Sequence, residues 1–95
     1  MSQLEDESNR IAVQMLIQKL PNAAVKFFLK AYPVISTERL ASCTRMAEAY
    51  GCTPQGASKH IEVLERFEYF ERVHYRAWTL NKRKITDVIS EGEYL

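Results

Sequence analysis

Polar side chains near the middle of the chain are of the types that bind nucleic acid. Gln55, Ser58 and Lys59 offer an amide, a hydroxyl and an ammonium group within one short segment. Such groups can hydrogen-bond the edges of purines or the oxygens of phosphates. Gly56 lies among them and is small enough to let the backbone approach a base closely. The segment therefore predicts a surface for duplex DNA, and the alternative is an ordinary solvated helix face.

The apolar residues around them predict a helix that turns these groups outward. Ala57, Ile61 and Leu64 recur at intervals of four and three residues, as expected of a buried stripe on a helix over residues 54–67. The opposite side of that helix would carry the polar side chains into solvent.

A tight break precedes this helix. Gly51 predicts the end of an earlier helix, because glycine adopts the left-handed C-terminal conformation without steric cost. Thr53 can cap the next helix through its hydroxyl, and Pro54 suits its first position. Two helices broken this tightly cross steeply. Residues 38–67 therefore predict a helix-turn-helix that presents its second helix to a DNA major groove.

The segment from Met46 to Arg66 resembles the helix-turn-helix of bacterial MarR-type and ArsR-type regulators. Those families combine an alanine in the first helix, a glycine turn, and a Ser-Lys/Arg-His-Leu-like segment followed by a leucine. The resemblance extends from about Glu38 to Leu80 and implies a winged helix-turn-helix fold. It also implies which residues face the groove: Gln55, Gly56, Ser58 and Lys59.

Two further positions can be compared with the same families. His60 matches the histidine of the family's recognition helix and is expected to contact the DNA backbone or to cap the fold. The chain departs from the family after this helix, because Glu68-Tyr69-Phe70 stands where the family has a glycine-led segment. The paired cysteines of metal-sensing members are absent from the sequence, so metal sensing is not implied.

Residues 69–80 predict a two-stranded ribbon, the wing of such a fold. Aromatic and β-branched residues cluster there with partial alternation, and the turn is expected near residues 74–77. Arg72, His74 and Arg76 are candidates for contacts with the DNA backbone or the minor groove. The alternative is that they are ordinary exposed charges of a strand.

The overall charge is nearly balanced, with 13 Lys and Arg against 12 Asp and Glu. This falls short of the strong positive charge that is typical of nucleic-acid binders. Between Gly51 and Lys84, however, there are seven basic residues and four glutamates. Arg45 and Arg66 are further candidates for phosphate contacts. The local surplus predicts modest binding that weakens with salt.

The N-terminal third predicts a dimer. Residues 1–9 are polar and acidic, and we expect them to be disordered. Residues 10–20 predict a helix so rich in apolar residues that two of its sides must be covered. One side would pack on its own domain and the other on a second copy of the chain. Four residues are candidates for that interface: Ile11, Met15, Leu16 and Ile17. The alternative is that the helix completes a monomeric core.

Further elements are expected between these parts. Residues 22–32 predict a helix that Pro33 ends. Residues 34–36 predict a short strand that pairs beside the wing. A helix capped at residues 36–37 would then run to Tyr50.

Other kinds of chemistry find little support in the sequence. It contains no phosphate-binding glycine loop, nucleophile elbow or metal-binding helix motif, so we expect neither catalysis nor a cofactor. Cys43, Cys52, His60 and His74 lack the spacing of a zinc site, so no metal is expected either. There is no secretory leader and no apolar run long enough to span a membrane. These features predict a cytoplasmic protein with reduced cysteines and no membrane contact.

The sequence thus predicts one α+β, mostly helical domain over residues 10–95, with a final short helix capped by Asn81. We expect a homodimeric winged helix-turn-helix protein that binds double-stranded DNA at a pseudo-palindromic site. It would act as a small transcriptional regulator of the plasmid or phage kind, most simply as a repressor that occludes a promoter. Two alternatives remain. One is a DNA-segregation adaptor that coats repeated centromere sites, and the other is a winged-helix module that docks a protein partner without binding DNA.

Overall fold

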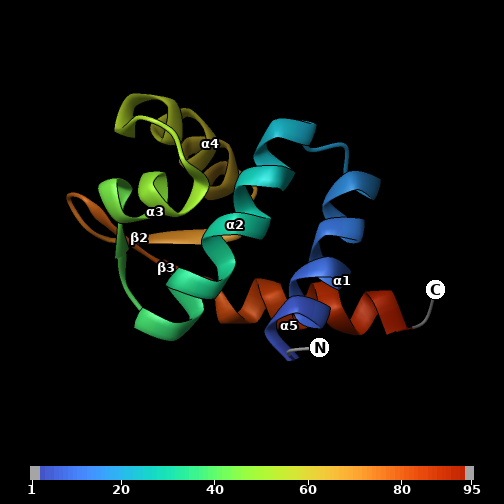
Figure 1. Cartoon of the computed structure of the whole chain (residues 1–95). Helices are drawn as coiled ribbons and strands as arrows, with labels where there is room; N and C mark the ends of the chain where they lie inside the picture. Colours follow the sequence, from blue (N-terminus) through green and yellow to red (C-terminus); the bar gives the residue numbers. More distant parts are fainter. Residues whose placement is uncertain (1–2, 94–95) are drawn as a thin grey trace.

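Helices dominate the residues that the computed structural model describes, which are 3–93 for the backbone and 6–90 for the side chains. This part of the chain forms five helices and a small three-stranded antiparallel sheet, which lies beside α2, α3 and α4 (Figure 1). The elements are α1 (Gln3–Ile17), α2 (Asn22–Glu38), β1 (Ala41–Ser42), α3 (Cys43–Tyr50), α4 (Pro54–Arg66), β2 (Phe70–His74), β3 (Ala77–Leu80) and α5 (Lys82–Glu93). The predicted α+β, mostly helical class is confirmed.

Helix α2 runs through the centre of the molecule and contacts α1, α3, α4 and the sheet. Its buried face is almost entirely apolar and consists of Ala24, Val25, Phe27, Phe28, Ala31, Tyr32 and Ile35. Its aromatic rings pack in tilted pairs, with Phe28 against Tyr69 and Phe70 at the start of the hairpin. This face is the core on which the other elements are positioned.

Pro33 does not end α2, contrary to the sequence-based prediction. It lies inside the helix, which continues to Glu38. A proline in a helix interior costs about 3 kcal/mol. Tyr32 and Ile35 lie on the buried face on either side of it. Burial of each such side chain contributes roughly 1.5–3 kcal/mol. The free energy gained by burying these two side chains therefore outweighs the cost of the backbone hydrogen bond that the proline cannot make.

The sheet also differs from the prediction at its first strand. The expected strand over residues 34–36 is part of α2, and the strand that forms is β1. It pairs with β3 in the order β1-β3-β2, with Ala41 opposite Trp78. The helix expected from residues 36–37 to Tyr50 is likewise replaced by the shorter α3. Ser42 caps α3 by accepting a hydrogen bond from the Arg45 amide at 3.1 Å.

The acidic N-terminus is helical where it is described, and this corrects the predicted disorder of residues 1–9. Helix α1 begins at Gln3, whereas residues 1–2 lie outside the described part. The Tyr32 hydroxyl donates a hydrogen bond to the Glu7 carboxylate at 2.9 Å, and Ser8 is buried. These contacts hold the first turns of α1 against α2, so that the helix expected over residues 10–20 is longer and begins earlier.

Helix α5 closes the fold against α1. Asn81 caps it as predicted, because its Oδ1 accepts a hydrogen bond from the Lys84 amide at 3.2 Å. Ile85 and Val88 turn into the core. Within residues 3–93, no helix has both the length and the apolar character that a membrane crossing requires.

Candidate functional site

The turn between α3 and α4 has the geometry that its residues predict. Gly51 adopts a left-handed conformation with a φ of 88°, and its amide donates to the Ala47 carbonyl at 2.8 Å. Thr53 then caps α4, because its Oγ1 accepts a hydrogen bond from the Gly56 amide at 3.1 Å. Pro54 occupies the first turn of α4, where no amide donor is needed. The start of α4 is therefore fixed by local bonds.

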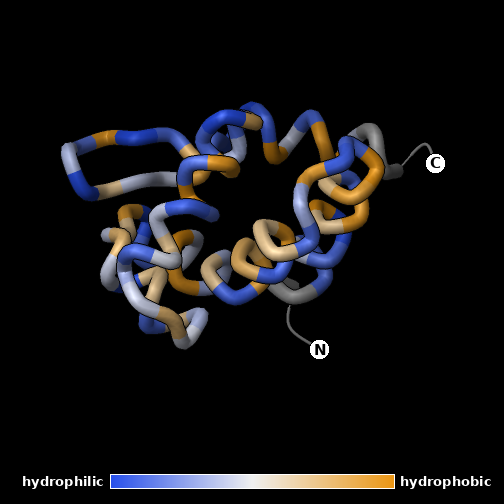
Figure 2. Tube along the Cα trace, turned by 90° about the horizontal axis from the view of Figure 1, so that it is seen from above, coloured by the Kyte–Doolittle hydropathy of each residue, from blue (hydrophilic) through white to orange (hydrophobic). Residues whose placement is uncertain are grey.

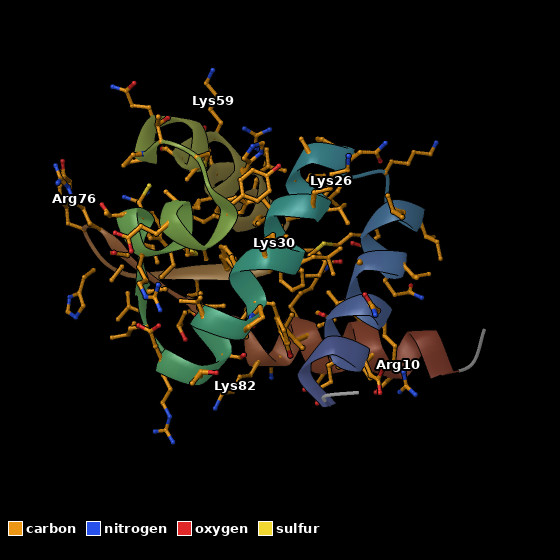
Figure 3. All side chains as sticks on the ribbon, viewed as in Figure 1. Arg10, Lys26, Lys30, Lys59, Arg76 and Lys82 are labelled. Carbon is orange, nitrogen blue, oxygen red and sulfur yellow. The ribbon has the colours of Figure 1, made fainter. Side chains whose placement is uncertain are left out.

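The rotation of α4 is fixed by its apolar stripe. Ala57, Ile61 and Leu64 are all buried against the core, as predicted. The polar side chains Gln55, Ser58 and Lys59 are consequently exposed. Figure 3 shows Lys59 directed away from the body of the molecule. Among the described residues, Lys59 lies within ion-pair distance of no carboxylate.

Two further candidates on this helix, Gly56 and His60, are only half-exposed. Gly56 is half-buried and faces the turn, so that an added Cβ would lie 3.4 Å from Thr53 Oγ1. His60 is also half-buried, and its ring centroid lies 5.3 Å from that of Phe27 and 5.9 Å from that of Tyr50. Helical geometry places both on the flank of the buried stripe. Gly56 therefore serves the turn, and His60 packs α4 against α2 and α3.

The hairpin of β2 and β3 is the second part of the site. It projects from the helical body, and Figure 2 shows that the β2 side carries most of its hydrophilic residues. Its turn falls at Tyr75 and Arg76, within the predicted range, and the pairing is irregular between Arg72 and His74. His74 is exposed, and Arg76 projects from the tip (Figure 3).

Tyr75 is a surface residue that the sequence analysis missed. It is 79% exposed, and the Arg76 guanidinium lies 5.4 Å from its ring centroid. Its position in a predicted turn, with no apolar residue directly beside it in the sequence, could have indicated that its ring is exposed. Its ring and the adjacent arginine together offer a flat, cationic surface at the tip of the hairpin.

Arg72 anchors the hairpin through contacts within the molecule. Its Nε lies 3.5 Å from Glu65 Oε1, and its guanidinium lies 5.0 Å from the Trp78 ring centroid. The Trp78 indole donates a hydrogen bond to the same Glu65 oxygen at 2.8 Å. Glu65, Arg72 and Trp78 therefore form one cluster that ties the hairpin to α4.

A groove of about 630 Å³ separates α4 from the hairpin. Gln55, Ser58 and Glu62 line its α4 side, and Tyr75 and Arg76 line its hairpin side. We call it the α4–hairpin groove. Because Glu62 and Glu65 line it together with Arg72 and Arg76, its opposite charges largely balance. Arg76, which lines the groove, and Lys59 on α4 have no ion-pair partner among the described residues.

The two remaining arginine candidates are paired in the structure. Arg45 donates through Nε to Glu38 at 3.1 Å and lies 3.9 Å from Glu48. Arg66 lies 3.7 Å from Glu62, one turn earlier on α4. Both pairs are exposed, so each contributes little to stability and can exchange for a phosphate. They are weaker candidates for phosphate contacts than Lys59 and Arg76.

Both cysteines are free thiols, and Cys43 begins α3 whereas Cys52 lies in the turn between α3 and α4. The Cys43 thiol donates a hydrogen bond to the Pro54 carbonyl at 3.2 Å, and burial raises its pKa above the ordinary thiol value. A raised pKa lowers the fraction of reactive thiolate. In the described part of the chain, no three His, Cys, Asp or Glu residues gather as metal ligands would.

Only some of the residues predicted to form the dimer interface are exposed. Ile11 and Met15 are fully buried in their own domain, so their assignment to an interface is wrong. Leu16 and Ile17 are 50% and 58% exposed, and Val13 lies beside them at 54%. Because α1 packs on both α2 and α5, one helical face remains for a partner. We call Val13, Leu16 and Ile17 the α1 apolar patch.

Comparison with known proteins adds no relative: no protein-family model matches the chain, and a search of curated proteins gives no match.

Proposed function

We propose that this chain is a winged helix-turn-helix protein that binds duplex DNA and regulates transcription, most simply by occluding a promoter. Helix α4 would enter the major groove, and the hairpin would act as the wing. One observation carries the proposal: Gln55, Ser58 and Lys59 all face solvent on one side of a helix whose rotation is locked by its buried stripe.

The residue types on that side suit the proposed contact. The Gln55 amide can bind an adenine edge, and Lys59 can bind a guanine or a phosphate. Arg76 at the hairpin tip would reach the phosphate backbone or the minor groove. Since the charge of the groove is nearly balanced, we expect few phosphate contacts and a correspondingly modest dependence on salt.

The α1 apolar patch supports a homodimer. Three adjacent apolar side chains that are each about half-exposed are more readily explained by a covering partner than by solvent. A two-fold dimer through this patch would place two copies of α4 on one face of a duplex. The site would then be pseudo-palindromic, with half-sites about one helical turn apart.

Selection of bound fragments from a pool of random duplexes tests the proposal. We expect enrichment of an inverted repeat, with protection of its major groove in footprinting. Tandem repeats and spreading along DNA would instead support a segregation adaptor. If no fragment is enriched above the starting pool, the protein is not a sequence-specific DNA binder.

A protein-docking role is the second candidate, favoured by the charges of the α4–hairpin groove. Glu62 and Glu65 line a surface where a phosphate backbone would be repelled. A peptide with mixed charges would suit such a surface better than DNA does. This candidate gains support only if the selection fails and Tyr75→Ala abolishes binding to a protein partner.

A further inference from the structure

A second cavity, of about 560 Å³, lies between the C-terminal half of α2, strand β3 and the start of α5. It is remote from α4, because Lys82 at the cavity and Lys59 on α4 lie at opposite ends of the molecule in Figure 3. Ile35, Leu80 and Ile85 contribute apolar side chains to its lining. Its volume lies within the range of small-molecule sites, roughly 300–1,000 Å³.

The charged residues of this cavity are of one sign. Within residues 6–90, Arg39 and Lys82 line it and no carboxylate does. Among the described residues, neither cation has an ion-pair partner. The cavity differs in this respect from the α4–hairpin groove, where Glu62 and Glu65 offset the arginines.

Hydroxyl groups add hydrogen-bonding capacity beside the cations. Ser36 and Thr79 line the cavity, and the Ser36 hydroxyl donates to the Tyr32 carbonyl at 2.6 Å. That bond uses the single hydroxyl proton of Ser36, so the hydroxyls that can donate to an anion in this lining are those of Thr79 and Thr86. Lys82 also lies in the first turn of α5, where cations oppose the helix dipole. An anion bound between Arg39 and Lys82 would relieve that unfavourable arrangement.

We propose that this cavity binds a small organic carboxylate with an apolar body. The apolar residues would cover the body, while Arg39 and Lys82 hold the carboxylate. An ion without an apolar part would leave half of the lining unused. The site stands apart from the proposed DNA binding, because it shares no residue with the exposed side of α4.

A titration followed by amide NMR tests the site, with 3-phenylpropanoate as the probe. We expect saturable shifts for cavity residues such as Ser36, Thr79 and Thr86, and none for Ser58 on α4. The neutral amide of the same acid should bind about tenfold more weakly, because it loses the charge-assisted bonds.

Substitutions separate a specific site from general attraction of anions. Arg39→Gln with Lys82→Gln should weaken binding of 3-phenylpropanoate about tenfold. The matched control is Arg83→Gln, which removes a neighbouring charge outside the cavity and should leave the affinity unchanged. All of these side chains are exposed, and the remaining amide spectrum checks the fold of each variant.

Three results would overturn the proposal. The first is the absence of shifts at the cavity at millimolar 3-phenylpropanoate. The second is equal affinity of the acid for the parent protein and the Arg39→Gln, Lys82→Gln variant. The third is that inorganic phosphate binds as tightly as 3-phenylpropanoate, since this would show that the apolar residues play no part. None of these depends on whether the protein binds DNA.

Discussion

Gly51 and Gly56, two glycines near the candidate site, should respond in opposite ways to substitution by alanine. Gly51 has a φ of 88°, and an added Cβ would meet no atom within 4 Å. The cost of a side chain there is therefore purely conformational. Gly56 lies in a helix with ordinary dihedral angles, and an added Cβ would be 3.4 Å from Thr53 Oγ1.

We expect Gly51→Ala to lower the free energy of unfolding by about 1–2 kcal/mol, the cost of a left-handed conformation for a residue with a Cβ. Gly56→Ala should raise it by up to about 1 kcal/mol through helix propensity. Urea unfolding of both variants measures these changes. Equal effects of the same sign would show that the turn is not built as described.

The predictions made for single residues agree with the structure where the conformation depends only on neighbouring residues. The roles of Gly51, Thr53 and Pro54 follow from neighbours within a few residues. The partners of Arg72 could not be predicted, because Glu65 and Trp78 approach it only after the hairpin has folded onto α4. No periodic pattern in the sequence indicates which residues far apart in the chain will form such contacts.

At the scale of elements, Glu65 holds the hairpin against α4. Glu65→Ala should lower the free energy of unfolding by about 1–3 kcal/mol, because it leaves the buried Trp78 indole without an acceptor. Glu65→Gln should cost less, since its amide oxygen can still accept the bond. The fluorescence of Trp78, the single tryptophan in the chain, reports unfolding. Similar losses for both variants would mean that the charge of Glu65, and not its acceptor, matters.

The bond between Tyr32 and Glu7 joins α1 to α2 and makes stability depend on pH. Burial, the hydrogen bond to Glu7 and the charge of Glu7 all raise the pKa of Tyr32 above its ordinary value. The folded state therefore favours the neutral hydroxyl. This contribution is fully present below the pKa of an unfolded tyrosine, about 10, and is lost as the pH rises above it.

Tyr32→Phe should lower the free energy of unfolding by about 1 kcal/mol near neutral pH, because it removes this hydrogen bond. The difference from the parent protein should shrink as the pH rises above about 10. Urea unfolding of the two proteins across that range measures it. A difference that stays constant with pH would contradict the assigned bond.

Element boundaries were predicted less well than element types. The final helix and α4 agree with their patterns, because each has a clear cap and period. The hairpin also forms where its partial alternation predicts it, with irregular pairing between Arg72 and His74. The end of α2 does not, since burial of Tyr32 and Ile35 outweighs the local preference of Pro33. The start of α1 was missed because an acidic segment gains its order from Tyr32, which lies far along the chain.

At the scale of the whole molecule, the α1 apolar patch predicts a dimer. Leu16→Lys should convert the protein to a monomer, because it places a charge in the proposed interface. The matched control is Leu40→Lys, which changes an apolar residue that is 42% exposed in the loop before β1. Sedimentation equilibrium measures the masses. A monomeric parent protein, or dissociation of the control alone, would contradict this interface.

The candidate site could be predicted for its side on α4 and for Arg76 on the hairpin, but not for the groove between them. Its exposed polar side follows from the period of Ala57, Ile61 and Leu64. The groove beside the hairpin depends on how the two elements pack, and so does the mixture of charges that lines it. The sequence alone therefore indicates a surface but not its electrostatic balance.

The proposed function depends most on contact between duplex DNA and two exposed cations, Lys59 on α4 and Arg76 at the tip of the hairpin. Fluorescence anisotropy of a selected duplex across a range of salt concentrations tests this with Lys59→Ala, Arg76→Ala. The control, Lys30→Ala, Arg83→Ala, removes the same charge elsewhere. We expect the first variant to bind at least about tenfold more weakly, with a salt slope smaller by about 2, and the control to bind as the parent protein does. Equal affinity of both variants, or parent binding that does not change with salt, would contradict the account.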